Sequence, residues 1–576
     1  MFCDWPHRLG GRGICVLIFF LLALHCEGAP RGTRDFSKTV EVEICIYGGT
    51  SGGVIAAVQG AKMGHSVVVV EPGRHLGGMT ASGLSWTDVG SSDRMWVIGG
   101  LAKEFYIRVG QHYGQSPDTV FEISKSTDAS RHGYDFAKPP SLSFEPKVAE
   151  KVFNDWLKEW NVPVYRDARL TAVRKKQERI REIVLHNGLR VRAKVFIDAT
   201  YEGDLLAMAG VSYTVGRESN QTYGETINGV QRPATSIRAG RFDVPVDPYR
   251  IPGDPSSGLL PYLLHEGEIG EVGSADNRVQ SYNYRVCLTD VASNKVAILP
   301  PNDYDPQKFE LLARWIAARV AAGKELSLRD FVKYDPLQNG KYDFNNRWAI
   351  STDFIGGAHE YPEADWATRR HIAREHENYL RGFFYFLGND PRVPAAVREE
   401  MNRFGLCRDE FPDNDGWPHQ LYVREARRMV SDFVMVEQHC TGERIAPSSI
   451  GMGAYGIDMH AVRRIVHERQ PVGEGTIGRP VPAPYPISYG AIIPRISECE
   501  NLLVPFALSA SHVAFGSIRM EPVFMILSQS AATAASLAIK ESVPVQHVRY
   551  EKLSRRLLAD GQVLSVQQRP SKSHHN

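Results

Sequence analysis

The sequence lacks the cysteine patterns of several protein classes. Only 8 of the 576 residues are cysteines, and none forms a C-x-x-C pair of the kind that binds zinc or carries out thiol redox chemistry. Three of the eight lie at the N-terminus, so the five that remain, scattered between Cys45 and Cys499, allow one or two disulfides at most. A disulfide framework and a cysteine-based zinc module are therefore both excluded.

The sequence also lacks an excess of charge of either sign. It has 67 lysines and arginines against 66 aspartates and glutamates, a formal net charge of +1. This balance gives no electrostatic reason to expect a nucleic acid partner or an anionic membrane surface. The histidines His439, His460 and His467 lack the spacing of metal ligands, so the sequence predicts no metal site.

The apolar stretch near the N-terminus, residues 14–24, is too short to cross a membrane comfortably. Arg8 and Arg12 precede it and small residues follow it, which is the pattern of a secretory signal peptide. We therefore predict that residues 1–29 are a signal peptide, that the mature chain is exported to the periplasm or secreted, and that it has no stable membrane span.

What the sequence does contain is a stretch, residues 43–80, with the pattern of a nucleotide-binding unit. Apolar runs at 44–47 and 67–70 predict two strands buried on both faces, and the second delivers Glu71 to its carboxyl end. Between them lie a glycine-rich turn and a helix of small residues. The turn contains Gly48, Gly49, Thr50, Ser51 and Gly53.

This unit suits the binding of a dinucleotide. A turn without side chains lets the backbone approach a pyrophosphate, and the N-terminus of the following helix offers unpaired N–H groups and a partial positive charge. Glu71 follows Gly48 by 23 residues, where an acidic side chain accepts hydrogen bonds from a ribose. The middle glycine of G-x-G-x-x-G is missing, because Thr50 stands in its place.

The residues after Glu71 add a second signature. Arg74 and the pair Gly77 and Gly78 follow it, and this order resembles the extended fingerprint of glutathione-reductase-type FAD-binding domains. The resemblance implies FAD as the cofactor, with NAD binding and a purely structural β-α-β unit as the alternatives. His75, inside this signature, is a candidate for contact with the flavin or for a covalent bond to it.

A second cofactor-contacting turn is expected where the apolar strand at 193–200 ends. Ala199 and Thr200 lie in this turn, and we expect Asp204 to cap the helix that follows. Leu170, at the start of a strand, and Gly516, near the C-terminus, complete the predicted cofactor-binding residues. Four short runs before this strand, at 162–164, 170–174, 180–186 and 189–191, predict a small antiparallel sheet beside the main one.

The predicted fold class is α/β: a Rossmann-like FAD-binding domain with a parallel sheet and a small antiparallel insertion, plus an inserted α+β substrate domain. We expect the FAD-binding domain at residues 40–225 and 485–550, the inserted cap at 226–484 and a flexible tail at 565–576. Helices are predicted at 309–320, 366–387, 420–437 and 522–539, a strand at 282–288 and a loop at 507–515.

The match to a known family is broad. The segments IYGGTSGGVIAA, EPGRHLGGMTASGL, FIDATYEGDLLAMAG, YVREARRMVSDFVM and LSASHVAFGSIRMEPVFMILSQSAATAA occur in this order. The order is similar to that of bacterial FAD-dependent oxidoreductases, which are loosely related to the fumarate reductase and glutathione reductase flavoproteins. The resemblance implies a two-domain flavoprotein with FAD extended across the sheet, and it implies no defined substrate.

Candidate catalytic residues come from the second half of the chain. His512 lies between the last strand and the last long helix, where it suits proton transfer, and Arg519 follows it by seven residues. Arg424, Arg427 and Arg428 share one face of the predicted helix at 420–437 and suit binding of a carboxylate. The alternatives are a histidine bonded to backbone and a solvated arginine face.

Three functions fit this pattern. The first is hydride transfer between flavin N5 and a small polar organic substrate, such as a sugar derivative or an organic acid, with an unknown electron acceptor. The second is a lyase or isomerase that uses flavin without net redox. The third is a serine hydrolase, because residues 49–53 satisfy G-x-S-x-G with Ser51 as the nucleophile; the early position of this motif and the missing acid and histidine weigh against it.

Overall fold

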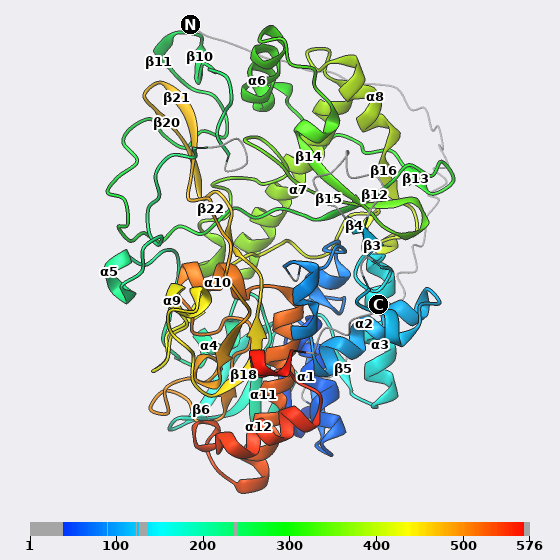
Figure 1. Ribbon diagram of the computed structural model, residues 1–576, viewed down its shortest axis with the longest axis vertical. Helices are drawn as coiled ribbons and strands as arrows, with labels where there is room; N and C mark the ends of the chain where they lie inside the picture. The colour runs from blue at the N-terminus through cyan, green and yellow to red at the C-terminus, as the bar shows by residue number, and fades with distance from the viewer. Residues whose placement is uncertain are drawn as a thin grey trace, which may run out of the picture.

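The computed structural model describes most of the chain after residue 37 and shows an elongated molecule (Figure 1). The described residues are 38–88, 90–122, 124–125, 136–137, 139–235 and 240–569. The predicted signal peptide and the last residues of the predicted tail lie outside them, and the start of that tail carries a short 3-10 helix, η12 (Val566–Gln568).

A seven-stranded sheet forms the base of the fold, in the strand order β5-β2-β1-β8-β7-β6, with β24 also paired to β8. Its strands are β1 (Thr39–Tyr47), β2 (Val67–Val70), β5 (Val164–Tyr165), β6 (Leu170–Lys176), β7 (Arg179–Leu185), β8 (Arg190–Asp198) and β24 (Leu502–Leu503). The strands β5, β2, β1, β8 and β24 run parallel. Since β2 is four buried valines, it packs on both faces, as the sequence predicts.

The antiparallel hairpin β6-β7 is part of this same sheet. The prediction that the antiparallel strands form a separate sheet beside the main one is therefore wrong. The two halves of β8 explain the difference. Along one edge β8 pairs parallel with β1 over its whole length; along the other edge its first residues pair antiparallel with β7, and its later residues pair parallel with β24. The run at 162–164 was expected to be antiparallel, yet β5 is a parallel neighbour of β2.

Two helices that pack on the main sheet are α1 (Ser51–Lys62) and α11 (Glu521–Glu541), and α11 also lies against α1 (Figure 1, lower half). A Cβ on Gly52 would lie 2.3 Å from Ser528 Oγ, so only glycine allows the two helices to come this close. The other helices nearby are α2 (Gly100–His112), α3 (Pro146–Glu159), α4 (Asp204–Met208), α5 (Asn220–Tyr223) and α12 (Tyr550–Ala559).

Among the described residues, α11 is the one helix long and apolar enough to cross a membrane. Of its most apolar stretch, 89% is buried inside the protein. The core helix of a globular protein can be as long and as apolar as a membrane span, and it is buried in this way. The helix therefore does not indicate a stable membrane span.

A second, five-stranded antiparallel sheet lies in the other half of the molecule (Figure 1, upper half). Its order is β13-β16-β12-β15-β14, with β12 (Val286–Thr289), β13 (Lys295–Val296), β14 (Val332–Pro336), β15 (Lys341–Asn346) and β16 (Gly405–Cys407). The helices α6 (Glu310–Ala321) and α7 (Trp366–Asn389) agree with the predicted ones, and α8 (Ala395–Arg403) follows. The strand predicted at 282–288 begins only at Val286.

Two predictions for the second half of the chain are wrong. Residues 420–436 contain no helix, and within them β17 (Arg428–Met429) pairs with β9 (Tyr213–Thr214). The predicted loop at 507–515 already contains the start of a helix, α10 (His512–Ile518), which Ser511 caps by accepting from the N–H of Ala514 at 3.1 Å. After α9 (Glu437–Thr441), the chain forms antiparallel pairs.

These pairs are β18 (Ser449–Gly453) with β23 (Tyr485–Ser488), β19 (Ile457–Met459) with β22 (Ile477–Arg479), and β20 (Arg463–His467) with β21 (Gln470–Glu474). Smaller ones are β3 (Ser124–Lys125) with β4 (Phe136–Ala137), and β10 (Tyr249–Ile251) with β11 (Asp254–Leu259). The alternation along β1 separates two hydrophobic clusters, because Ile44 and Ile46 face one and Cys45 and Tyr47 face the other.

Candidate functional site

The turn after β1 has no room for side chains at two of its glycines. Gly48 has a φ of +103°, and a Cβ there would lie 2.6 Å from the carbonyl oxygen of Ala199. A Cβ on Gly53 would lie 1.9 Å from the carbonyl oxygen of Gly48. The backbone is therefore drawn tightly between β1 and β8, and the start of α1 is left open to a ligand.

Thr50, in place of the middle glycine, serves this turn in its own way. Its hydroxyl accepts a hydrogen bond from the N–H of Gly53 at 3.1 Å and so caps α1. The same hydroxyl donates to the carbonyl oxygen of Ala199 at 2.8 Å. The side chain is thus held against the protein, which explains how the motif tolerates a residue other than glycine here.

Glu71 connects the turn after β1 with the turn after β2 through hydrogen bonds. Its carboxylate accepts from the N–H of Gly49 at 2.5 Å and from the N–H of Gly73 at 2.6 Å. Burial raises the pKa of Glu71 to about 7, and these two bonds oppose the rise. Each oxygen keeps a further lone pair, with which it can accept from a ribose hydroxyl.

A cavity of about 360 Å³ opens at the carboxyl ends of β1, β2 and β8. Open α/β sheets bind ligands at this edge, and the volume lies within the roughly 300–1,000 Å³ of small-molecule sites. The predicted residues that line it are Gly48, Thr50, Glu71, Arg74 and Thr200. The second half of the chain contributes Tyr361, Trp366, Arg369 and His419, which no sequence motif identifies.

The residues around this cavity fit a dinucleotide. The turn in which Gly48 and Gly53 leave no room for a Cβ lies at the N-terminus of α1, where backbone N–H groups attract phosphate. Glu71 at the end of β2 matches a ribose, and Trp366 presents an aromatic surface in the same cavity. The geometry therefore supports the nucleotide half of the predicted cofactor site.

Three predicted cofactor residues have other contacts. Leu170 donates its N–H to Tyr47 Oη at 3.0 Å, and its side chain belongs to the hydrophobic cluster with Tyr47. Asp204 does not cap α4, contrary to prediction; it forms ion pairs of 2.8 Å with Arg369 and with Arg427. Gly516 lies inside α10, where a Cβ would be 2.2 Å from Met459 Sδ.

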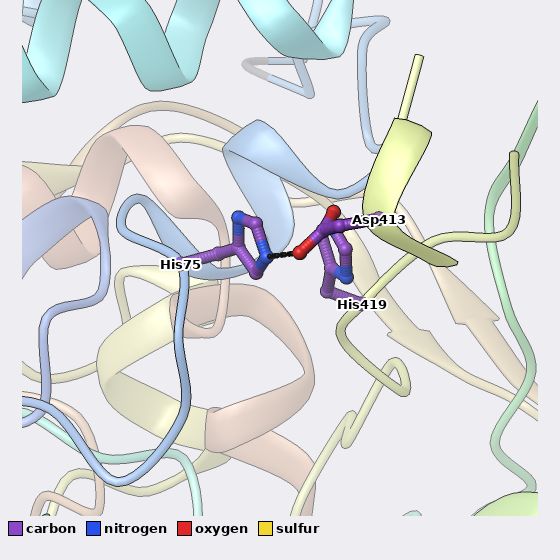
Figure 2. Close-up of side chains that lie close together, drawn as sticks. All are labelled: His75, Asp413 and His419. Carbon is purple, nitrogen blue, oxygen red and sulfur yellow. Dashed lines mark hydrogen bonds and ion pairs between the residues drawn. The ribbon is translucent and has the colours of Figure 1, made fainter. Parts of the chain in front are cut away.

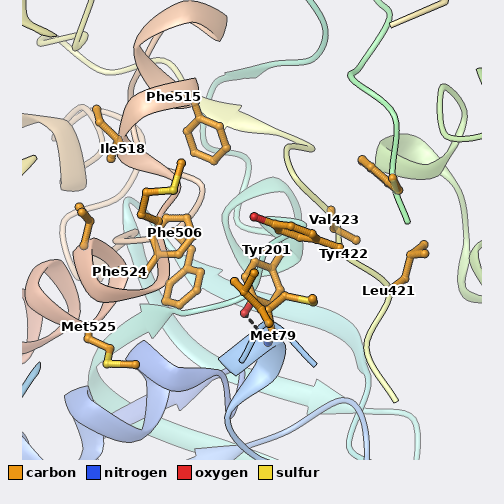
Figure 3. Packing of buried hydrophobic residues seen from close by; sticks show 14 of the residues in the cluster. Met79, Tyr201, Leu421, Tyr422, Val423, Phe506, Phe515, Ile518, Phe524 and Met525 are labelled. Atoms are coloured by element: carbon orange, nitrogen blue, oxygen red, sulfur yellow. Dashed lines mark hydrogen bonds between the residues drawn. The ribbon is translucent and has the colours of Figure 1, made fainter. Parts of the chain in front are cut away.

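A buried carboxylate, that of Glu521 at the start of α11, holds the second glycine pair and the start of α1 together. It accepts from Ser51 Oγ and Thr80 Oγ1, each at 2.6 Å, and from Tyr201 Oη at 2.7 Å. Figure 3 shows Tyr201 between Met79, whose N–H donates to it, and Phe506. Burial raises the pKa of Glu521, and these three donors oppose the rise.

The glycine pair is shaped around the same network. Gly77 and Gly78 both have positive φ, and a Cβ on Gly78 would lie 2.4 Å from Tyr201 Oη. A side chain at this position would displace Tyr201 from Glu521. The central role of Glu521 has no signal in the sequence, because its donors Ser51 and Thr80 lie far from it along the chain.

Ser51 has the wrong surroundings for a hydrolytic nucleophile. Its side chain is fully buried, it is the first residue of α1, and its hydroxyl donates to Glu521. A nucleophile elbow instead presents its hydroxyl at an open site and pairs it with a histidine. Among the described residues, no histidine hydrogen bonds to Ser51, so the geometry disfavours the hydrolase.

Two of the predicted catalytic arginines meet at Tyr422, although no helix brings them together. Arg519 donates to Tyr422 Oη at 3.0 Å, and the guanidinium carbon of Arg424 lies 4.7 Å from the centre of the Tyr422 ring. Arg424 also pairs with Asp353 at 2.9 Å and Arg519 with Asp458 at 3.4 Å. Both arginine side chains are buried.

His512 lies next to this cluster. The Nδ1 of His512 lies 3.0 Å from Oε1 of Glu425, which is the residue after Arg424. The His512 ring is fully buried. Gln280 donates to the other oxygen of Glu425 at 2.9 Å. The structure thus brings His512, Arg519 and Arg424 into one buried polar region, which the sequence placed only by their positions along the chain.

The other two arginines of the predicted helix have separate partners. Arg427 binds Glu363 at 2.7 Å in addition to Asp204, and Arg428 binds Glu218 at 2.9 Å. The three arginines therefore do not share one face, and the predicted carboxylate clamp by all three is wrong.

Tyr422 connects the arginine cluster to Tyr201, and Figure 3 shows these two tyrosines near each other. Burial raises the pKa of Tyr201, and Tyr422 is a minor further cause of this rise. Arg519 is two residues from Glu521 along the chain. The arginine cluster therefore adjoins the network centred on Glu521.

Comparison with known proteins agrees with this site. A profile of the family described as FAD dependent oxidoreductase matches residues 43–557, nearly the whole described chain. No curated protein sequence matches.

Among solved structures, L-proline dehydrogenase from P. horikoshii is 10% identical over 90% of this chain and 99% of that one, with a TM-score of 0.35. L-amino acid deaminase from Proteus vulgaris is 15% identical over 31% of this chain, with a TM-score of 0.23, and the chain spans 53% of its length. TM-scores this low carry no argument. The family match over most of the sequence, together with a glycine cradle and an acidic strand end that fit a dinucleotide, means that this chain belongs to the FAD-dependent oxidoreductase family, with FAD as its cofactor.

Proposed function

We propose that this flavoenzyme transfers a hydride between flavin N5 and a small organic acid, or a sugar derivative that carries a carboxylate, and that it acts after export. The observation that carries the substrate class is the pair of buried guanidinium groups, those of Arg424 and Arg519, which both contact Tyr422. Buried arginines at a site beside the glycine pair suit an anionic substrate, because guanidinium binds carboxylate with strong, directed hydrogen bonds.

Buried polar atoms without a partner support this assignment. The Nε atoms of Arg424 and Arg519 and the Nε2 of His512 are buried and have no hydrogen-bond partner among the described residues. A buried polar atom left without a partner costs about 1–3 kcal/mol, so a ligand that bonds to these atoms recovers that free energy. Three such atoms from one polar region point to a bound polar molecule.

His512 is placed to handle the proton that accompanies hydride transfer. Oxidation of a hydroxy acid removes a C–H hydrogen with its electron pair, and the hydroxyl proton must go to a base. Glu425, beside Nδ1, fixes the tautomer that leaves the Nε2 lone pair free. When bound, FAD supplies the ring that accepts or returns the hydride.

A small cavity of about 10 Å³ lies between Thr80, Tyr422 and Glu521. Its volume is that of a water molecule rather than a ring. A flavin ring placed here therefore requires Tyr422 or Met520 in its lining to move aside.

The test is anaerobic reduction of the purified holoenzyme, followed by the loss of flavin absorbance, with matched pairs of organic acids and their neutral amides or alcohols. We expect acids alone to bleach the flavin, and Arg519→Lys to slow bleaching about 10- to 100-fold, the effect of losing one charge-assisted hydrogen bond. Arg217→Lys, a buried arginine paired with Asp276 and Glu474, is the control. Bleaching by neutral compounds alone would contradict the proposal.

The same assay separates the lyase alternative. A redox enzyme stops after one turnover without an external electron acceptor, whereas a lyase or isomerase continues, because the hydride returns to the product. Product measured over many turnovers in the absence of any acceptor would therefore replace hydride transfer with net elimination or isomerisation.

A further inference from the structure

Both halves of the chain line the cavity of about 360 Å³ at the carboxyl ends of β1, β2 and β8. Glu71 and Arg169 come from the first half of the chain, and Trp366 comes from the second. A ligand that fills this cavity therefore contacts side chains from both halves, although the glycine turn and the acidic strand end belong to the first half alone.

The order of the strands arranges the parts of a dinucleotide along this cavity. From β1 the sheet continues through β2 to β5. The start of α1, after β1, suits the pyrophosphate, and Glu71, after β2, suits a ribose. The next segment in the same direction follows β5, and it carries Arg169 into the lining of the cavity. We therefore expect the base of the dinucleotide beside Arg169.

The backbone of this segment has no N–H group left for a base. Three successive N–H groups donate within the protein: Ala168 to the carbonyl oxygen of Glu71 at 3.0 Å, Arg169 to His186 Nδ1 at 3.1 Å, and Leu170 to Tyr47 Oη at 3.0 Å. Side chains must therefore recognise the base.

Trp366 brings its indole to the cavity from the first position of α7. The guanidinium carbon of Arg369, one turn later, lies 5.5 Å from the centre of the indole ring. Arg369 is itself fixed, because it donates to Asp204 at 2.8 Å and to the carbonyl oxygen of Tyr361 at 3.0 Å. The indole is therefore oriented before a ligand binds, which lowers the entropic cost of binding.

Arg169 offers a guanidinium group with unused donors. Its guanidinium carbon lies 5.9 Å from the centre of the Trp366 ring. Within the described part of the chain, its side chain forms no ion pair and no hydrogen bond. A planar guanidinium can stack on a base or donate to its ring nitrogens, and an indole stacks on the face of a base. Both kinds of group that hold an unstacked base thus meet in this cavity.

Ion pairs beside the cavity hold the two halves of the chain together (Figure 2). His75, after β2, lies with Nε2 3.0 Å from Asp413 in the second half of the chain, and with Nδ1 2.9 Å from Glu150. His419, which lines the cavity, lies 3.3 Å from the other oxygen of Asp413. Both ring nitrogens of His75 are thus engaged by carboxylates. These contacts hold the half of the chain that carries Trp366 against the segment after β2.

We propose that the adenine of FAD binds against Trp366 and Arg169, so that the second half of the chain supplies part of the cofactor site. Trp366 stacks on the base, and Arg169 donates to its ring nitrogens. FAD thereby joins the two halves of the chain. The same two residues select FAD over FMN, which has no adenosine.

The experiment titrates apoprotein, prepared from the purified holoenzyme, with FAD, ADP and FMN. ADP contains the adenosine and the pyrophosphate without the flavin, and FMN contains the flavin without the adenosine. We expect ADP to compete with FAD and to raise the melting temperature of the apoprotein, and FMN to do neither. Trp366→Leu should weaken the binding of FAD and of ADP about 10- to 100-fold, the effect of losing one stacked aromatic ring. Trp366→Phe should recover most of this loss.

Trp348→Leu is the matched control, because Trp348 is also half-buried, has the guanidinium of Arg347 4.6 Å from its ring centre, and lies outside the cavity. Arg169→Gln should weaken ADP binding, whereas Arg190→Gln, at an exposed position at the start of β8, should not. Circular dichroism shows that each variant is folded. Folded Trp366→Leu protein that binds ADP as tightly as the wild type would overturn the proposal. FMN binding as tight as FAD binding in the wild type would overturn it as well.

Discussion

Ser51 donates a hydrogen bond of 2.6 Å to Glu521, although 470 residues separate them along the chain. The bond joins the first residue of α1 to the first residue of α11, so the two helices begin at one point. Tyr201 and Thr80 bond to the same carboxylate, which makes Glu521 the centre of the site's framework.

Ser51→Ala should therefore be a structural change with little chemical effect. Glu521 keeps its other two donors, so we expect a loss of about 1 kcal/mol in the free energy of unfolding, with FAD content and oxidoreductase activity preserved. Denaturant unfolding measures the first, and Ser554→Ala on the surface is the control. Labelling of Ser51 by a serine-directed probe would revive the hydrolase.

Glu71→Gln should weaken FAD retention, because an amide accepts weaker hydrogen bonds from a ribose than a carboxylate does. We expect about 10- to 100-fold weaker binding, measured by titration of apoprotein with FAD. Glu43→Gln is the control, since Glu43 lies near the opposite end of the same sheet and pairs with Lys194. Equal effects of the two substitutions would contradict a direct role for Glu71.

The raised pKa of Glu71 predicts a pH dependence with a definite sign. Below about pH 7 the carboxyl of the apoprotein is protonated, and FAD binding favours the ionised form, so affinity should rise with pH and level off above 7. The apoprotein should conversely lose stability as pH rises from about 4.5 to about 7, because folding raises this pKa. Both trends should be absent in Glu71→Gln.

Gly53→Ala should abolish FAD binding. The added Cβ would lie 1.9 Å from the carbonyl oxygen of Gly48, so the turn must open, at a cost of about 1–3 kcal/mol or more. Gly478→Ala, with no atom within 4 Å of the added carbon, should be neutral. Flavin absorbance of the purified variants decides between the two, and a yellow Gly53→Ala protein would disprove the turn's role.

His512→Ala should lower kcat about 10²- to 10⁴-fold, the usual contribution of general acid–base catalysis, while flavin content stays unchanged. Its pH–rate profile should lose one limb, which a purely structural role would not cause. His359→Ala removes a histidine that bonds to the carbonyl oxygen of Val462 outside the cluster, and should leave kcat unaffected. A normal pH profile in His512→Ala would exclude proton transfer by this residue.

Export can be tested through Cys287 and Cys407. Their sulfurs lie 3.9 Å apart on the adjacent strands β12 and β16, and all five described cysteines are free thiols in the structure. In an oxidising compartment these two thiols should lose two electrons and two protons to the oxidation machinery and form a disulfide. Alkylation and mass spectrometry of protein from its native compartment measure this, and two alkylated thiols there would argue against export.

Local sequence patterns were enough to predict the nucleotide half of the site. The buried strands, the glycine turn and Glu71 depend on contacts over a few residues and on hydrophobic periodicity, which are visible along the chain. The long apolar or amphipathic helices, such as α7, were predictable for the same reason. Thr50 could be seen to depart from the motif, but its bond to Ala199 could not be inferred.

The arginine cluster could be found only in the tertiary structure. The spacing of Arg424, Arg427 and Arg428 favours a helix by only a few tenths of a kcal/mol per residue. Carboxylates from elsewhere, among them Asp353 and Glu218, bind these guanidinium groups separately, and buried charge pairs outweigh so small a preference. The cluster of His75 with Asp413 arises in the same way: charges distant in sequence must be paired once folding removes them from water, and sequence spacing does not show which charges will meet.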